Sequence, residues 1–149
     1  MRVVIQRVEK SDVVIKGEVK GSIGQGLALL VGFTTGDTIA DIEFLVKKIV
    51  NLRIFDNEHG IMNKSILDIK GEVLSISQFT LYADTKGGNR PSYSAALKAT
   101  EATILYDMFN KKLCDFVPTK TGVFGAEMKV NITNDGPVTI IIDSKQSNL

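Results

Sequence analysis

The segment Asn134–Thr139 reads Asn-Asp-Gly-Pro-Val-Thr, and it lies between two stretches that favour β-structure. Apolar and polar residues alternate over Met128–Thr133, and Val138–Ile142 is a nearly continuous apolar run. Since Asn, Asp and Gly tolerate the positive φ angles of a tight turn, the pattern predicts a hairpin of two strands. Pro137 is unusual there, because it lacks a backbone donor where the second strand should begin to pair. Two interpretations follow: an ordinary turn, or a Gly-Pro peptide displayed with its carbonyl groups toward a ligand.

Apolar periodicity elsewhere predicts two helices. Thr38 and Asp41 fit a capping box at the start of the first helix. Its apolar stripe has helical spacing and consists of Ile42, Leu45, Val46 and Ile49. Ser92 or Ser94 is expected to cap a longer helix that reaches about Leu113. The expected inner face of this second helix consists of Leu97, Ile104, Leu105, Met108 and Phe109.

Short alternating or apolar runs predict further strands, over residues 2–8, 12–15, 18–23, 27–33, 52–55, 66–69 and 72–81. Strands and helices do not alternate strictly along the chain. We therefore expect an α+β fold with a largely antiparallel sheet or partial β-barrel and two main helices. A chain of 149 residues is expected to form a single domain over residues 1–149.

Composition narrows the class of protein. Hydrophobic residues make up 44% and charged residues 23%, as in globular proteins, and no apolar run approaches the roughly 18 residues of a membrane span. The N-terminus alternates like a strand and lacks the apolar region of a signal peptide, and Cys114 is the only cysteine. These features predict a cytoplasmic protein with no membrane partner. Cys114 is expected to be a partly buried small hydrophobe.

The net charge of +1 at pH 7 predicts no strong general attraction to nucleic acid, and DNA is not an expected partner. A polyanion would have to be held by a local patch or by shape. The candidates for a local patch are Lys86, Arg90, Lys98, Lys111, Lys112, Lys120 and Lys129. For most of them, an ordinary solvated surface side chain is the default interpretation.

Side chains suited to acid–base or metal chemistry are scarce. His59 is the only histidine, and it lies in the polar turn Asp56–Gly60, where a surface position explains it better than catalysis. Neither His59 nor Cys114 has partners at metal-ligand spacing, so we expect no metal and no other cofactor. Ser77 is not part of a Gly-x-Ser-x-Gly elbow, so a serine hydrolase triad is not predicted.

Two stretches together resemble the paired motifs of the D-aminoacyl-tRNA deacylases. They are Ser77–Leu81, which reads Ser-Gln-Phe-Thr-Leu, and Asn134–Thr139. Met1–Val8, Asn89–Tyr93 and Thr121–Met128 are also similar to motifs of this family, in the same order along the chain. The resemblance extends over nearly the whole chain, which makes it more specific than any single five-residue match.

The resemblance implies both an activity and an assembly. Members of this family hydrolyse the ester that joins a D-amino acid to the 3′-terminal adenosine of tRNA, and they also act on glycine mischarged on tRNA(Ala). They are homodimers whose active sites lie at the subunit interface. By resemblance, Gly136–Pro137 is a cis peptide that one subunit inserts into the pocket of the other, where it filters substrates by chirality.

The catalytic residues that the resemblance implies are Gln78, Phe79 and Thr80, with Ser77 as a neighbouring substrate-binding residue. Backbone N–H groups around Phe79 and Thr80 would stabilise the oxyanion of the tetrahedral intermediate. The Thr80 side chain either makes a positioning hydrogen bond or acts as a nucleophile, and the second role lacks a base nearby in the sequence. The family instead implies that the 2′-hydroxyl of the terminal ribose helps to activate water.

The remaining substrate-binding residues are expected to select and hold the aminoacyl end. Carbonyl groups of Gly136 and Pro137 would accept hydrogen bonds from the α-ammonium group, and this backbone would clash with an L side chain but not with glycine. Arg7 either braces this motif across the pocket or is a surface strand arginine. Phe124 and Met128 either contact the terminal adenine or pack in the core.

Two other function classes compete with the deacylase. A covalent hydrolase with Thr80 or Ser77 as its nucleophile would need a base. A small RNA-binding or interaction module would bind tRNA without cleaving the ester.

Overall fold

Strand β1 (Arg2–Ile15) lies in the middle of the sheet in the computed structural model, which describes residues 1–146. It joins the two strands expected over residues 2–8 and 12–15. Its C-terminal half pairs with β2 (Glu18–Ile23), and its N-terminal half pairs with β3 (Gly26–Gly32). Strand β8 (Lys129–Asp143) lies along nearly the whole length of β1. All three pairings are antiparallel, so a single long strand organises most of the sheet.

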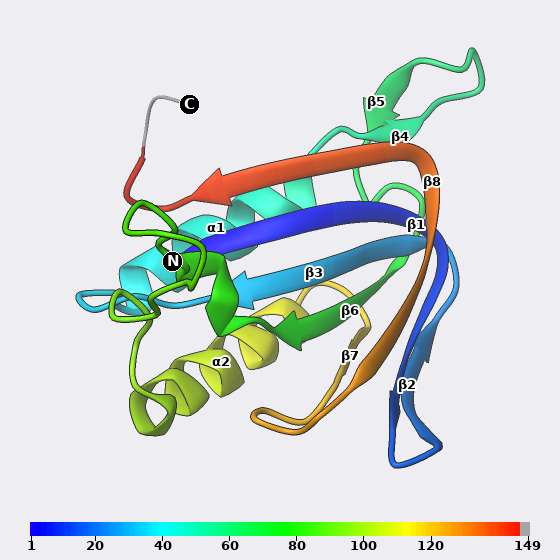
Figure 1. Ribbon diagram of the computed structural model, residues 1–149. Helices are drawn as coiled ribbons and strands as arrows, with labels where there is room; N and C mark the ends of the chain where they lie inside the picture. Colours follow the sequence, from blue (N-terminus) through cyan, green and yellow to red (C-terminus); the bar gives the residue numbers. More distant parts are fainter. Residues whose placement is uncertain (147–149) are drawn as a thin grey trace.

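Two parallel pairings complete the sheet. Strand β3 pairs with β6 (Glu72–Ser77), and β6 pairs with β7 (Thr119–Thr121). These neighbours are parallel because each is reached by a crossover that contains a helix. The sheet bends so strongly that it nearly closes into a barrel (Figure 1), and β4 (Phe55–Asp56) and β5 (Met62–Lys64) form a separate small hairpin. The expected α+β fold with two helices and a partial barrel is confirmed.

Helices α1 (Ile39–Asn51) and α2 (Ala99–Cys114) contact each other and cover one face of the sheet (Figure 1). Their buried side chains, among them Leu45 and Phe109, pack with inward side chains of β1 and β3 such as Ile5. A second, smaller apolar cluster fills the barrel-like part of the sheet. No helix among residues 1–146 is long and apolar enough to cross a membrane.

The expected hairpin around Asn134–Thr139 is wrong, because the chain does not reverse there. Residues on both sides of this segment belong to β8, and both parts run antiparallel to β1. Gln6 pairs with Thr139 and Val8 pairs with Asn134, so the intervening residues of β8 lie opposite Arg7 alone. The turn-forming residues therefore produce a large bulge in one strand instead of a connection between two strands.

The strand expected over residues 66–69 is also wrong. These residues form a turn, in which the Ser65 N–H donates to the Asp68 carboxylate at 2.8 Å and the Asp68 N–H donates to the Ser65 hydroxyl at 3.2 Å. Such reciprocal bonds compete with strand pairing, which explains the failure of the apolar pattern.

The second helix begins later than expected. Helix α2 starts at Ala99, after Lys98 as the N-cap, and neither Ser92 nor Ser94 caps it. Ile104 is 61% exposed instead of lying on the inner face, because the buried stripe runs through Ala102, Tyr106, Phe109 and Leu113. Cys114 is exposed at the end of this helix, so the expectation of a partly buried thiol is also wrong.

The capping box of α1 is present and includes a third partner. The Thr38 N–H donates to Asp41 Oδ2 at 2.8 Å, and Lys145 Nζ lies 3.0 Å from the same oxygen. Burial raises the pKa of Asp41, but hydrogen bonds from Ser144, Thr38 and Lys145 outweigh it and hold this pKa well below the ordinary 3.8. An ionised Asp41 therefore stabilises the folded state.

Asp41→Asn is expected to lower the free energy of unfolding by about 1 kcal/mol near pH 7, and the Tm by about 3 °C. Because the pKa is lower in the folded state, the contribution of Asp41 is fully present above its ordinary pKa and is lost as the pH falls below it. The Tm difference should therefore shrink between pH 5 and about pH 3. Thermal unfolding across this range tests the expectation, with Glu9→Gln as the control, because Glu9 is exposed on β1. A difference that does not change with pH would contradict it.

Candidate active site

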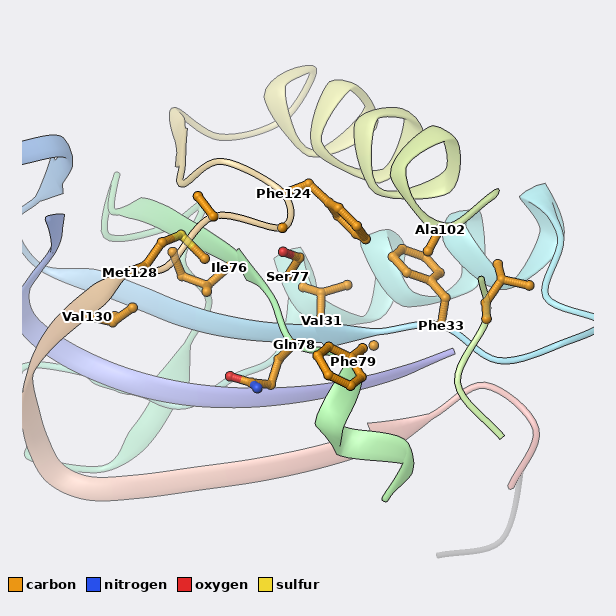
Figure 2. Close-up of a pocket in the computed structure, with 14 residues that line it drawn as sticks. Val31, Phe33, Ile76, Ser77, Gln78, Phe79, Ala102, Phe124, Met128 and Val130 are labelled. Carbon is orange, nitrogen blue, oxygen red and sulfur yellow. The ribbon is translucent and has the colours of Figure 1, made fainter. Parts of the chain in front are cut away.

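A hollow of about 290 Å³ lies between the ends of β3 and β6, the start of α2 and the loop that precedes β8. Most of its walls are apolar, and Figure 2 shows the side chains around it. Polar side chains come from Ser77 and Gln78, at the C-terminal end of β6. The hollow is therefore a concave apolar site with a few polar groups at one edge, as small-molecule sites generally are.

The chain changes direction at this edge. Strand β6 ends at Ser77, so the expected continuation of this strand is wrong. The Gln78 N–H donates to the Val31 carbonyl oxygen at 2.7 Å, and the 3-10 helix η1 (Phe79–Tyr82) begins at the next residue. N–H groups in the first turn of a helix have no acceptor within that helix. Those of Phe79 and Thr80 are in this position, next to the hollow.

Gly32, the last residue of β3, allows η1 to lie close to the sheet. A Cβ atom at this position would come within 3.0 Å of the Gln78 carbonyl oxygen and 3.1 Å of Leu81 Cβ. Any larger residue at position 32 would therefore push the start of η1 away from its present place.

The Thr80 hydroxyl is engaged in a local contact. It accepts a hydrogen bond from Gln78 Nε2 at 2.5 Å, whereas Thr80 itself does not line the hollow. Because the amide N–H is a donor, this contact does not supply the base that a threonine nucleophile needs. The contact orients the Gln78 amide, and this geometry favours a positioning role for Thr80.

Phe124 and Met128 form the opposite side of the hollow (Figure 2). Tyr106 of α2 supports this side: its ring lies 5.9 Å from the Phe124 ring, and its hydroxyl donates to the Ser75 carbonyl oxygen at 2.7 Å. Burial raises the pKa of Tyr106, so the hydroxyl keeps its proton. Phe124 and Met128 also pack against the two core clusters, so each side chain has one face in the core and one in the hollow.

Arg7 is buried, with 7% of its surface exposed, so the alternative of a surface strand arginine is wrong. Its Nε donates to the Asp135 carbonyl oxygen at 3.0 Å, and its Nη1 donates to the Ile54 carbonyl oxygen at 2.8 Å. The carboxylates of Asp56 and Asp135 each lie 3.7 Å from the guanidinium. Arg7 thus ties the bulge of β8 to the segment before β4.

Gly136 and Pro137 are exposed in this bulge, and the peptide bond between them is cis. Gly136 has a φ of +125°, and a Cβ atom there would lie 3.0 Å from Arg7 Nη2. Neither residue lines the hollow of its own chain, nor does Arg7. Apart from Thr80, the expected site residues therefore separate into two groups. We call Ser77, Gln78, Phe79, Phe124 and Met128 the hollow cluster, and Arg7, Gly136 and Pro137 the bulge cluster.

Gly32 and Tyr106 shape the site, but the sequence patterns did not single them out. Gly32 interrupts the apolar run of β3, and a glycine inside a strand is a signal of close backbone approach. Tyr106 lies in the buried stripe of α2, where a tyrosine hydroxyl needs a partner.

His59 lies on the surface, as expected. Its side chain is 74% exposed and sits 3.8 Å from Glu58, in the turn between β4 and β5. Among residues 1–146, no three His, Cys, Asp or Glu side chains lie together as a metal-binding group.

The chain is similar to a known protein family and to solved structures. Residues 4–143 match the family model described as D-Tyr-tRNA(Tyr) deacylase. A solved structure named c-Myc DNA Unwinding Element Binding Protein is similar at 40% sequence identity and a TM-score of 0.91, over 96% of this chain and 98% of that one. A probable eukaryotic D-amino acid tRNA deacylase is similar at 16% identity and a TM-score of 0.81, over 95% of this chain and 97% of that one. At that identity, the second likeness shows a shared fold alone.

Proposed function

This chain belongs to the D-Tyr-tRNA(Tyr) deacylase family and is a hydrolase of the aminoacyl-tRNA ester bond, and from that premise we propose how its two clusters carry out the reaction. The aminoacyl ester of a D-aminoacyl-tRNA binds in the hollow cluster. Its carbonyl oxygen lies at the N–H groups of Phe79 and Thr80. The apolar walls exclude bulk water, which strengthens these hydrogen bonds.

The reaction consists of the attack of one water molecule on the ester carbonyl carbon. The negative charge that develops on the carbonyl oxygen is stabilised by the backbone donors, each of which typically contributes 10²–10³ in rate. The bond between the carbonyl carbon and the ribose oxygen then breaks, and that oxygen takes up a proton. The products are a free D-amino acid and a tRNA with a 3′-hydroxyl group. The neighbouring 2′-hydroxyl of the ribose orients the attacking water.

The terminal adenine binds against Phe124 and Met128. An aromatic ring can stack on a single-stranded base, and a methionine side chain adapts to the rest of its surface. The support of Phe124 by Tyr106 fixes the position of this ring. The hollow cluster thus places the adenine opposite the backbone donors.

Selection by chirality needs the bulge cluster of a second copy. The Gly136 and Pro137 carbonyl groups accept hydrogen bonds from the substrate α-ammonium group, and their backbone blocks the direction in which an L side chain would point. Glycine has no side chain and is not rejected, so glycyl-tRNA(Ala) is also a substrate. Two features support the proposal that a second copy supplies Gly136 and Pro137. These two residues are exposed but held in place by the buried Arg7, and they do not line the hollow of their own chain. The working form is a homodimer.

One observation carries the proposed mechanism: the 3-10 helix η1 begins with Phe79 in the wall of a hollow whose polar side chains, Ser77 and Gln78, are both neutral. Such a site suits an ester that is already activated. It does not suit a substrate that needs strong acid–base catalysis by side chains.

The direct test is to incubate the purified protein with D-Tyr-tRNA and L-Tyr-tRNA and to follow loss of each ester. The expected result is rapid loss of the D-ester, with the L-ester lost only at its spontaneous rate. Sedimentation should give the mass of two chains. Equal rates for both esters would overturn the chirality filter, and tRNA binding without ester loss would favour an RNA-binding module.

The covalent alternative is tested with Thr80→Ala. If the Thr80 hydroxyl were the nucleophile, this variant would lose at least about 10³ in kcat. A positioning role predicts a loss of about tenfold or less, because the backbone donors remain. Ser77→Ala, measured in parallel, distinguishes the two hydroxyl groups.

Gly32→Ala is expected to lower kcat for D-Tyr-tRNA roughly tenfold, because the added methyl group displaces the start of η1 by a few tenths of an ångström. The control is Gly24→Ala, where the nearest atom to the new methyl group, Glu72 Oε1, lies 3.7 Å away. The measurement is single-turnover hydrolysis by both variants. Equal activity of the two would show that the position of η1 does not matter.

A further inference from the structure

The segment of residues 84–98, which we call the basic segment, connects η1 to α2 and runs along the left end of the molecule in Figure 1. It carries three cations, Lys86, Arg90 and Lys98, against one carboxylate, that of Asp84. All three cationic residues are exposed. This local excess of positive charge contrasts with the net charge of +1 of the whole chain.

The basic segment is fixed at the edge of the hollow by backbone and ring contacts. Reciprocal hydrogen bonds of 2.8 and 2.9 Å between the backbones of Asp84 and Ser92 close its first part into a loop. The Tyr93 ring then packs edge-on against Phe79, with ring centroids 5.1 Å apart. The Leu97 N–H donates to the Phe33 carbonyl oxygen at 3.0 Å, and both of these residues line the hollow. The cations are thus carried by a segment with a defined position next to the proposed ester site.

The three cations have no acidic partner among the described residues. None of the ion pairs within residues 1–146 includes Lys86, Arg90 or Lys98. Asp84 accepts the backbone N–H of Lys86 at 2.9 Å. Glu101, in the first turn of α2, is the nearest acidic residue that follows in the sequence. The charges are therefore available to an external anion.

A second basic site is weaker on the same criteria. Another hollow beyond Met128 is lined by Lys16 and Lys129, but Glu127 lies in it as well. Its excess of positive charge is smaller, and no aromatic pair joins it to Phe79. It serves as the rival location for the same ligand.

We propose that the basic segment binds the phosphodiester groups of the single-stranded tRNA 3′ end while the terminal ester occupies the hollow. This inference rests on the proposed function and deepens it. Arginine and lysine bind phosphate by charge-assisted hydrogen bonds, and Arg90 can contact two phosphate oxygens at once. The contacts do not depend on base identity, so they hold any tRNA 3′ end in the same register.

The test compares two D-tyrosyl esters with the triple variant Lys86→Ala, Arg90→Ala, Lys98→Ala. The first ester is D-Tyr-tRNA, and the second is 3′-O-(D-tyrosyl)adenosine, which has no phosphate. The variant should lose about tenfold in kcat/KM on the tRNA at low salt and nothing on the adenosine ester. Its affinity for uncharged tRNA should depend less on salt, with the slope of log K against log salt reduced by about 2 for three lost single-strand contacts.

A matched control removes the same charge elsewhere, at lysines that are exposed on β1 and α1. The control Lys10→Ala, Lys47→Ala, Lys48→Ala avoids the other candidates for a phosphate-binding patch, and it should leave both kcat/KM values and the salt slope unchanged. Equal losses on the two esters, an unchanged salt slope in the basic-segment variant, or an equal effect of Lys16→Ala, Lys129→Ala would overturn the proposal. If the wild-type protein hydrolyses neither ester, the proposed function fails, whereas the salt slope with uncharged tRNA still tests the basic segment.

Discussion

Gly136→Ala is expected to reduce the rate of D-Tyr-tRNA hydrolysis by about a hundredfold and to weaken discrimination against the L-ester. Alanine is strained at a φ of +125°, and its Cβ would lie 3.0 Å from Arg7 Nη2 and 3.1 Å from the Val138 side chain. The bulge must therefore shift, and the carbonyl groups that are proposed to hold the α-ammonium group shift with it. Single-turnover rates with D-Tyr-tRNA and L-Tyr-tRNA measure both effects.

The control for this variant is Gly36→Ala. Gly36 also has a positive φ, of +93°, but a Cβ there meets no atom within 4 Å. It carries a comparable backbone strain, of order 1–3 kcal/mol, outside both clusters. If Gly136→Ala behaves like Gly36→Ala, with a lower Tm but an unchanged ratio of D to L rates, the motif is not the selector.

Arg7→Met is expected to lower the free energy of unfolding by roughly 2–4 kcal/mol and the Tm by about 5–10 °C. Methionine keeps much of the apolar volume of the side chain but leaves the buried Ile54 carbonyl oxygen and the Asp135 carbonyl oxygen without their donor. The bulge loses its attachment, so the discrimination between D- and L-esters should fall as well. Thermal unfolding and the two single-turnover rates report the two effects separately.

Arg53→Met is the matched control, because Arg53 also donates to a backbone carbonyl oxygen, that of Asn63, but is exposed. Its replacement should change stability by less than about 0.5 kcal/mol. Arg7→Lys should recover part of the stability, since one charged donor is retained. A normal D-to-L ratio in Arg7→Met, measured below its Tm, would show that Arg7 supports the fold but not the selection.

Apolar side chains that repeat every two residues, as in strands, or every 3.6 residues, as in helices, were sufficient to predict the fold class and the first helix. The stripe of α1 is buried as expected, because a core-facing helix must bury one face. The same reasoning failed where polar side chains compete with the backbone ladder, as at Ser65 and Asp68, and where a strand ends in a 3-10 turn after Ser77. Local hydrogen bonds of this kind do not change the apolar periodicity of the sequence, so the periodicity cannot predict them.

The error at Asn134–Thr139 has a different cause. Turn-forming residues specify a local change of backbone direction, but a hairpin and a large bulge can use the same residue types. In a hairpin, the two flanking stretches pair with each other, whereas here both of them pair with β1, which is long enough to reach both. This pairing partner lies far away in the sequence, so the local pattern does not reveal it. For the same reason, periodicity and turn chemistry did not separate the hollow cluster from the bulge cluster. Only the family resemblance implied that Gly136 and Pro137 serve the pocket of another subunit.

The first half of β8 also limits the distance between the hollow and the bulge. Met128 lies in the hollow directly before the first residue of β8, and Gly136 follows it by eight residues. At about 3.3 Å per residue, the two are separated by at most about 26 Å. In the proposed dimer, Met128 of each chain lies in that chain's own site, and Gly136 lies in the site of its partner. The two sites of the assembly are then at most about 26 Å apart, since β8 bends along its course (Figure 1). A residue added to or removed from the first half of β8 would misalign both of them at once.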